Sequence, residues 1–212
     1  MVTHSHIRAS RGARFQLAPI ADMAPDMDTR TLLLDHAEAV VRARGFDGFS
    51  YADLAVAVGI RKPSIHHHFP RKADLALALV ERYVARLFAR LEVLGAQQDR
   101  ASDRLRALIG SYREGLDGGS KLCLCVALAA GRDSLDPAVL ARVNGFHGRV
   151  VDLFAACFAA GAADGSVAAV VDPRAEAHAA LALMEGAQLV ARAAGRLDLF
   201  DAATAGLRAR LA

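Results

Sequence analysis

Residues 45–83 read GFDGFSYADLAVAVGIRKPSIHHHFPRKADLALALVERY, and this stretch decides the fold. Ser50 and Asp53 have the spacing of a capping box, in which the Ser50 hydroxyl accepts from the Asp53 backbone N–H and the Asp53 carboxylate reaches back. Gly59 can adopt the left-handed backbone conformation that ends a helix. Pro63 suits the first residue of the next helix, because an N–H there would have no helical partner. The stretch predicts two short helices joined by a tight turn, the second covering about 63–69.

Longer helices are expected on both sides of this pair. An apolar stripe at helical spacing predicts a helix over about 31–44, and a second stripe predicts one from about 71 to 95. The two stripes consist of Leu33, Leu34, Ala37, Val40 and Val41, and of Leu75, Leu79, Tyr83, Leu87 and Leu91. Phe46 and Phe49 should pack under the first helix.

Further helices are expected at about 101–116, 121–131, 137–162, 173–194 and 198–211, separated by glycine pairs and Asp-Pro or Asp-Gly breaks. The sequence therefore predicts an all-α protein with about nine helices. Its expected organisation is an arm without helical periodicity (1–27), a three-helix head (28–73) and a larger helical body (74–212).

Composition agrees with a folded helical protein. Apolar residues make up 54% of the chain, which excludes disorder of the whole. Residues 1–72 hold 10 Lys and Arg against 7 Asp and Glu, whereas the rest holds 16 of each, so the net charge of +3 lies in the first third. Three cysteines form no disulfide or CxxC framework, and no signal peptide or long uncharged apolar stretch is visible, so a cytoplasmic protein is expected.

Two short helices with a glycine turn, the second opening with cations, are typical of a helix-turn-helix, whose second helix enters the DNA major groove. Ala55 is small enough to let the two helices approach closely. Residues 45–83 resemble the DNA-binding head of the TetR family, whose usual pattern is a glycine-aromatic turn, a capped helix, then G-[VI]-x-x-x-[ST]-[IL]-[YH]-x-[HY]-F-x-x-K. The match runs for about forty residues without a gap.

The resemblance implies a set of DNA-contacting residues on and beside the second short helix. Tyr51 and Lys72 should hold phosphates, the helix should read base edges, and His68 should pack inward near Phe69. Arg61, Pro63 and His66 stand where a small capping residue, glycine and tyrosine are usual in the family. The full predicted set is Ser50, Tyr51, Arg61, Lys62, Pro63, Ser64, His66, His67, His68 and Lys72.

No enzyme motif, metal site or cofactor is predicted. Residues adjacent on a helix point about 100° apart, so the three histidines at 66–68 cannot converge on one metal ion. The chain contains no H-E-x-x-H motif, no phosphate-binding glycine loop and no paired carboxylate site.

Small residues on one face of the helix at 173–194 suggest a close helix contact between two subunits. That face comprises Ala179, Ala182, Gly186, Val190 and Ala194. The resemblance implies a four-helix dimer interface formed by about 173–211, which would pair two heads on a palindromic site. The alternative is a face buried within one subunit.

A ligand pocket is expected in the body, with apolar walls and a few polar groups. The candidates for its lining are Tyr112, Leu116, Cys123, Cys125, Phe146, Val150, Phe154, Phe158, Met184 and Gln188. The alternative for each is plain core, since any bundle interior contains such stripes.

Cys123 and Cys125 follow the Gly118-Gly119 break, where a helix start and Lys121 would lower a thiol pKa. The segment KLCLCVALAA and the later Met184-Glu185-Gly186-Ala187 resemble a TetR subgroup with a Gly-Cys-Leu-type segment, some of whose members sense electrophiles; Leu122 replaces the usual glycine. The alternative is a pair of structural cysteines, and placement on one helix would prevent a bond between them.

Together these observations predict a ligand-responsive transcription regulator. It is expected to be a homodimeric repressor of a palindromic operator in double-stranded DNA, released by a small-molecule effector of unknown identity or by a thiol-reactive inducer. An activator of the same fold, or a helical adaptor that no longer reads DNA, is the alternative.

Overall fold

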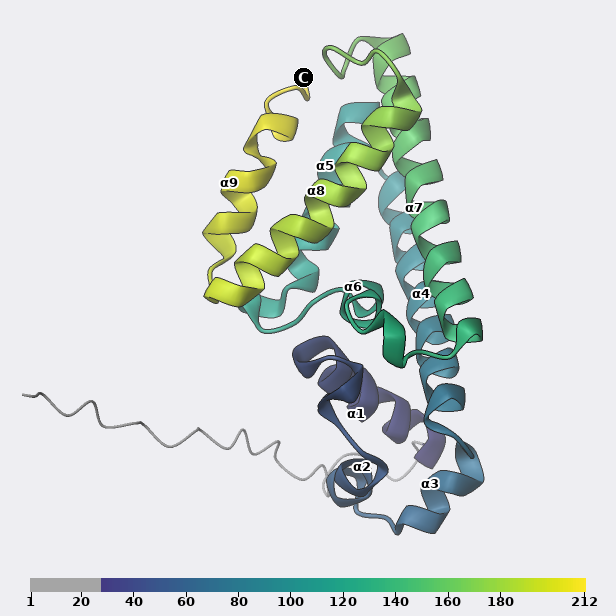
Figure 1. The fold of residues 1–212 in the computed structure, drawn as a ribbon. Coiled ribbons are helices and arrows are strands. Elements are labelled where there is room, and N and C mark those ends of the chain that lie inside the picture. The colour runs from purple at the N-terminus through teal and green to yellow at the C-terminus, as the bar shows by residue number, and fades with distance from the viewer. Residues whose placement is uncertain (1–27) are drawn as a thin grey trace, which may run out of the picture.

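The computed structural model describes residues 28–212, and the predicted all-α architecture is confirmed there (Figure 1). The predicted arm, 1–27, lies outside the described residues. The helices are α1 (Thr29–Arg44), α2 (Tyr51–Val58), α3 (Lys62–His68), α4 (Lys72–Ala96), α5 (Ala101–Gly115), α6 (Leu124–Ala129), α7 (Pro137–Asp164), α8 (Pro173–Ala194) and α9 (Leu197–Arg208). Short 3₁₀ turns cover Phe46–Gly48, Asp117–Gly119 and Arg132–Ser134.

The first three helices form a small head at one end of the molecule (Figure 1). The predicted capping box opens α2: the Ser50 hydroxyl accepts from the Asp53 N–H at 3.3 Å, and the Asp53 carboxylate accepts from the Ser50 N–H at 2.7 Å. Gly59 ends α2 in the left-handed conformation, with φ 75° and ψ 28°. Phe46 and Phe49 are buried, as predicted.

The body is arranged around α7, which packs against α4, α5, α6 and α8, while α9 covers α8. α4 leaves the head and runs along α7, so one continuous helix joins the two parts of the molecule (Figure 1). By length and composition alone α7 is apolar enough to cross a membrane, but its contacts with four other helices are typical of a helix in a packed bundle.

α6 is shorter than the helix predicted over 121–131. The Leu122 N–H donates to the Arg42 carbonyl at 2.9 Å, and the Cys123 N–H donates to Gln188 Oε1 at 3.1 Å. Because these amides are satisfied by α1 and α8, the segment before Leu124 stays extended, and the helix begins at that residue.

Candidate functional site

The outward side of α3 forms an exposed polar surface. Ile65 and Phe69 are buried and anchor the helix to the head, which leaves its remaining side chains free to face solvent. Of the predicted DNA-contacting residues, Arg61, Lys62, Pro63, Ser64, His66 and His67 are exposed, and His68 is half-buried, as its predicted inward packing requires. The structure therefore leaves these residues exposed along α3 and at its N-terminal end.

Tyr51, which was predicted to hold a phosphate, makes its contacts inside the head. Its side chain is buried in the head, and its hydroxyl donates to the Phe69 carbonyl at 2.9 Å. Burial, followed by the charge of Asp74, raises the pKa of Tyr51 to about 12. The ring also packs edge-on against His66, with centroids 5.0 Å apart. Tyr51 thus ties the end of α3 to α2 and helps to fix the position of the exposed surface.

Lys72 and Ser50 also make their hydrogen bonds within the head. The Lys72 ammonium donates to the Phe46 carbonyl at 2.7 Å and lies over the Phe46 and Phe49 rings at 4.4 and 4.5 Å. This partial burial lowers the pKa of Lys72. The Ser50 hydroxyl donates to the Asp53 carboxylate at 2.8 Å while it caps α2. Both side chains stay near the surface, but their best contacts are internal.

The body contains an inner cavity of about 30 Å³ between α4, α5, α7 and α8. The predicted lining residues that reach it are Tyr112, Cys123, Phe146, Val150, Phe154 and Gln188. Four other predicted lining residues are instead buried in the surrounding core: Leu116, Cys125, Phe158 and Met184. A space of this size holds a water molecule or two and no organic molecule.

The polar groups of the inner cavity are unequally satisfied. Gln188 is used at both ends, because its Nε2 donates to the Tyr112 carbonyl at 2.7 Å and its Oε1 accepts from the Cys123 N–H. The Tyr112 hydroxyl is buried and has no hydrogen-bond partner within residues 28–212. Burial raises the pKa of Tyr112 well above its ordinary value. A buried donor without a partner is a place where a ligand gains a hydrogen bond.

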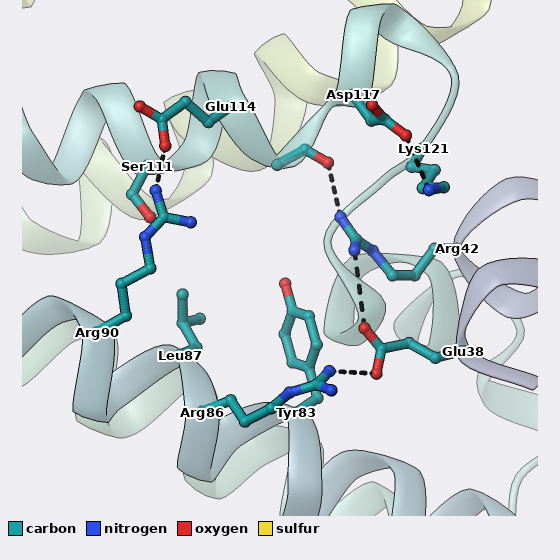
Figure 2. Close-up of a pocket in the computed structure, with 11 residues that line it drawn as sticks. Glu38, Arg42, Tyr83, Arg86, Leu87, Arg90, Ser111, Glu114, Asp117 and Lys121 are labelled. Atoms are coloured by element: carbon teal, nitrogen blue, oxygen red, sulfur yellow. Dashed lines mark hydrogen bonds and ion pairs between the residues drawn. The ribbon is translucent and has the colours of Figure 1, made fainter. Parts of the chain in front are cut away.

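An outer pocket of about 410 Å³ adjoins the inner cavity, and Tyr83, Leu87, Ser111 and Gly115 line both (Figure 2). Its mouth carries ion pairs between helices: Arg86 pairs with Glu38, and Arg90 pairs with Glu114. Figure 2 shows these side chains reaching across the opening from α1, α4 and α5. The pocket provides a polar approach to the apolar interior.

Arg42 of α1 connects the head to the wall of the inner cavity. Its Nε donates to the Leu122 carbonyl at 2.8 Å, and its Nη2 donates to the Gly115 carbonyl at 2.7 Å. Leu122 returns a hydrogen bond to the Arg42 carbonyl, and the next residue, Cys123, is held by Gln188. A short chain of hydrogen bonds therefore runs from the cavity to α1.

Cys123 and Cys125 are both buried, with 4% and 0% of their surfaces exposed. The placement of both on one helix was wrong, because Cys123 is the N-cap residue with ψ 137° and only Cys125 lies within α6. The Tyr83 hydroxyl donates to Cys123 Sγ at 3.4 Å. Hydrogen bonds from the Cys125 thiol, the Tyr83 hydroxyl and nearby backbone N–H groups lower the pKa of Cys123 to about 6. Cys125, as the proton donor of the pair, has a raised pKa.

A second polar pair lies between α7 and α8, where His147 Nε2 is 3.0 Å from Glu185 Oε1. Hydrogen bonding to Glu185 raises the pKa of His147. Three-quarters or more of each side chain is covered, since 23% of each is exposed. The pair links α7 to α8.

Sequence reasoning missed the α4 contribution to the cavity. Tyr83, Leu87 and Leu91 line it, yet they were read only as the apolar stripe of a long helix. The stripe was the available signal, because the same face that buries α4 also forms the wall. Only the packing of α4 against α5 and α7 shows that side chains do not fill all the space beside this face.

The helix-turn-helix head, joined by one helix to a body with an internal cavity, defines the class of DNA-binding transcription regulators that carry their own ligand-binding domain. The chain matches the family described as bacterial regulatory proteins, tetR family, over residues 33–79. It matches the tetracyclin repressor-like C-terminal domain over residues 101–207. The chain belongs to the TetR family of transcriptional regulators.

Solved structures and curated relatives agree with this assignment. A TetR-family regulator from Agrobacterium tumefaciens is 32% identical, with 86% of this chain and 97% of that chain covered and a TM-score of 0.82. The reduced form of Escherichia coli NemR is 27% identical, with coverages of 87% and 98% and a TM-score of 0.74. The regulator CymR from Pseudomonas putida is 33% identical over 111 residues, which is 50% of this chain and 53% of CymR. The matched segment spans about half the length of the curated relatives.

Proposed function

We propose that this chain is a homodimeric repressor that acts in the cytoplasm, binds a palindromic operator, and releases it when an effector occupies the inner cavity. The observation that best supports this proposal is the exposure of polar side chains on α3. Arg61, Lys62, His66 and His67 are exposed, while buried apolar residues anchor the helix to the head. Cations at the start of such a helix suit DNA phosphates, and side chains along it suit base edges in the major groove.

The dimer is supported by the outward face of α8. All five small residues predicted for the seam are exposed in the single chain, as Ala179, Ala182, Gly186, Val190 and Ala194. Val190 is 56% exposed and the adjacent Leu189 is 45% exposed, which is unusual for large apolar side chains on an otherwise packed helix. In a dimer, α8 and α9 of one subunit would pack against α8 and α9 of the other subunit. This contact would bury Leu189 and Val190. Two heads would then face half-sites one helical turn of DNA apart, about 34 Å.

Release follows from the small size of the inner cavity. A molecule larger than one or two waters must separate α4 from α5 and α7, because α4 supplies Tyr83, Leu87 and Leu91 to the wall. The same helix begins at Lys72, directly after α3, so its displacement changes the position of the head. Effector and DNA then favour different conformations and weaken each other's binding reciprocally.

A thiol-reactive inducer would use Cys123. This thiol lines the inner cavity, and hydrogen bonds from Cys125 and Tyr83 lower its pKa, which favours the reactive thiolate. Alkylation would add bulk to the cavity wall next to the hydrogen bond between Cys123 and Gln188. If this route operates, Cys123→Ser loses reagent-induced release from DNA while it keeps DNA binding.

The test is binding of the purified protein to the DNA upstream of its own gene, compared with a scrambled fragment, by fluorescence anisotropy across a salt series. Selective binding is expected. Lys62→Ala should weaken binding to both fragments and lower the salt slope by about one. His67→Ala should change the ratio between the fragments. Arg100→Ala, an exposed cation at the start of α5 in the body, is the matched control and should change neither.

Weak, unselective binding that disappears with salt would contradict the repressor and favour the helical adaptor. A reporter gene under the bound promoter separates repressor from activator. Deletion of the regulator gene should raise reporter expression, and a fall would assign activation.

A further inference from the structure

One ring nitrogen of His66 is bonded inside the head, and the other has no partner there. His66 is exposed on α3, and its Nδ1 lies 3.2 Å from the Pro70 carbonyl oxygen. A carbonyl oxygen can only accept, so Nδ1 carries the hydrogen and donates it. In a neutral imidazole the second nitrogen then has a lone pair and no hydrogen. His66 Nε2 makes no hydrogen bond within residues 28–212, so it is the nitrogen available to DNA, and in the neutral ring it can only accept.

The neighbours of His66 place it beside the DNA backbone. Its ring packs edge-on against Tyr51, the first residue of α2, with centroids 5.0 Å apart. In a helix-turn-helix the first helix of the pair crosses the DNA backbone. Lys62 is an exposed cation one turn before His66, and it therefore lies on the same face of α3. His66 thus lies next to a helix that meets the backbone and on the same face as a cation suited to phosphate.

A DNA phosphate and a neutral His66 do not form a hydrogen bond. Phosphate oxygens are acceptors, and so is Nε2 while the ring is neutral, so the contact would bring two lone pairs together. A second ring proton changes Nε2 into a donor, and Nδ1 keeps its hydrogen bond to Pro70. The imidazolium also carries a positive charge, which strengthens its hydrogen bond to phosphate.

We infer that His66 contacts a DNA phosphate as an imidazolium, so that each chain takes up a proton at Nε2 when it binds DNA. The proton comes from solvent, the new N–H donates to a phosphate oxygen, and no covalent bond to phosphorus forms or breaks. The inference rests on the proposed DNA binding by α3, but on neither the operator sequence nor the effector. Because the bound state holds more protons than the free state, DNA affinity rises as pH falls. Imidazole groups ordinarily change their charge between about pH 5 and pH 8, so the effect lies near neutral pH.

The charged and titratable groups around His66 leave this proton exchange to DNA. On α2, Tyr51 stays neutral, because burial raises its pKa to about 12. On α4, Arg71 and Asp74 bond to each other, with Arg71 Nη2 2.6 Å from Asp74 Oδ1. The remaining charged or titratable side chains of α2, α3 and the start of α4 are Asp53, Lys62, His67, His68 and Lys72. Within residues 28–212 the only histidine paired with a carboxylate is His147, in the body, so a DNA phosphate is the first anion with which His66 pairs.

The first experiment reads the position of the ring hydrogen in the free protein. Imidazole nitrogen chemical shifts of the full chain are recorded by NMR from about pH 6 to pH 8, and His66 is assigned by comparison with His66→Gln. At the upper end of this range Nδ1 should carry the hydrogen and Nε2 should carry none. An Nε2–H tautomer there would overturn the inference, and this result involves no DNA.

The second experiment measures proton uptake on binding. Affinity for the operator fragment is measured by fluorescence anisotropy between about pH 6 and pH 8 at fixed ionic strength, because phosphate contacts depend strongly on salt. Each proton taken up per chain weakens binding by up to about tenfold for each unit rise in pH. Calorimetry in two buffers of different ionisation enthalpy counts the same protons directly.

His66→Gln is the decisive variant, because its side-chain amide donates to phosphate without a proton. It should take up between about half a proton and one proton less per chain than the wild type. At about pH 8 it should bind DNA at least as tightly as the wild type. His67→Gln is the matched control and should keep the wild-type proton uptake, since His67 is also exposed on α3 but makes no hydrogen bond within the described residues. His147 is present in all three proteins, so its own titration cancels.

The outcomes separate the inference from the proposed repressor. Equal pH dependence of the wild type and His66→Gln, with helicity retained by circular dichroism, would contradict the inference. Wild-type affinity that falls on acidification, relative to the variant, would assign Nε2 as an acceptor for a base amino group and would also overturn it. If no fragment is bound selectively, the repressor proposal fails. The same series on nonspecific duplex DNA then still decides proton uptake, since a phosphate contact does not depend on sequence.

Discussion

Replacement of Arg42 by methionine should destabilise the protein by about 3 kcal/mol. Methionine keeps the length of the side chain but removes the hydrogen bonds to the Leu122 and Gly115 carbonyls at 2.8 and 2.7 Å. A hydrogen bond from a charged donor contributes about 1.5–3 kcal/mol. We use the lower value for each of the two hydrogen bonds, because 16% of the Arg42 side chain is exposed and water can partly replace the guanidinium as a donor. The free energy of unfolding is measured by urea denaturation at fixed protein concentration, since a dimer is expected.

The same change should weaken communication between cavity and head. Operator affinity should change little, because Arg42 is remote from α3, while the effector concentration needed for release should rise. Arg44→Met is the matched control, since Arg44 lies on the same helix, is exposed, and makes no hydrogen bond or ion pair within residues 28–212. Equal stabilities of the two variants, within about 0.5 kcal/mol, would refute the assignment of Arg42 as the connection.

Three further changes test other parts of the structure. Ser50→Ala should lower the free energy of unfolding by about 1 kcal/mol, through loss of the capping box with Asp53, as read from urea midpoints. Tyr112→Phe should raise it by about 1 kcal/mol, because the unpartnered hydroxyl is removed, and should weaken effectors in titration calorimetry. Pairing with Glu185 raises the pKa of His147, so its stabilisation is complete below the unfolded value of about 6.5 and is lost as pH rises through the folded value. Urea midpoints between about pH 6 and pH 8 should show this loss, and Glu185→Gln should abolish it.

The head could be predicted from sequence because its signals are local. The capping box, the turn glycine and Pro63 each constrain one or two residues of backbone. The first two are found where they were expected, and Pro63 is the second residue of α3 where it was expected as the first. The roles of Tyr51 and Lys72 could not be read in this way. Whether a hydroxyl or an ammonium faces DNA or the core depends on the Phe69 and Phe46 carbonyls, which lie 18 and 26 residues away in the chain.

The body was less predictable because its decisive contacts are distant in sequence. The extended backbone before α6 exists because Arg42 and Gln188 satisfy the amides of Leu122 and Cys123 over separations of about eighty and sixty-five residues. No periodic pattern contains that information. The same separation explains why Met184, read as a pocket residue, is fully buried in the core behind the cavity.

The small volume of the inner cavity also restricts which molecules can act as effectors. A ligand shifts an equilibrium only by the difference between its affinities for the two conformations. A molecule bound only in the outer pocket contacts Arg86 and Glu114 in a space of about 410 Å³ that is already open, so it gains little from movement of α4. A molecule that enters the inner cavity must separate Tyr83 from Cys123 and Gln188, and it gains the Tyr112 hydroxyl in return. Strong binding without release is therefore expected of ligands confined to the outer pocket, and release is expected of those that reach Tyr112.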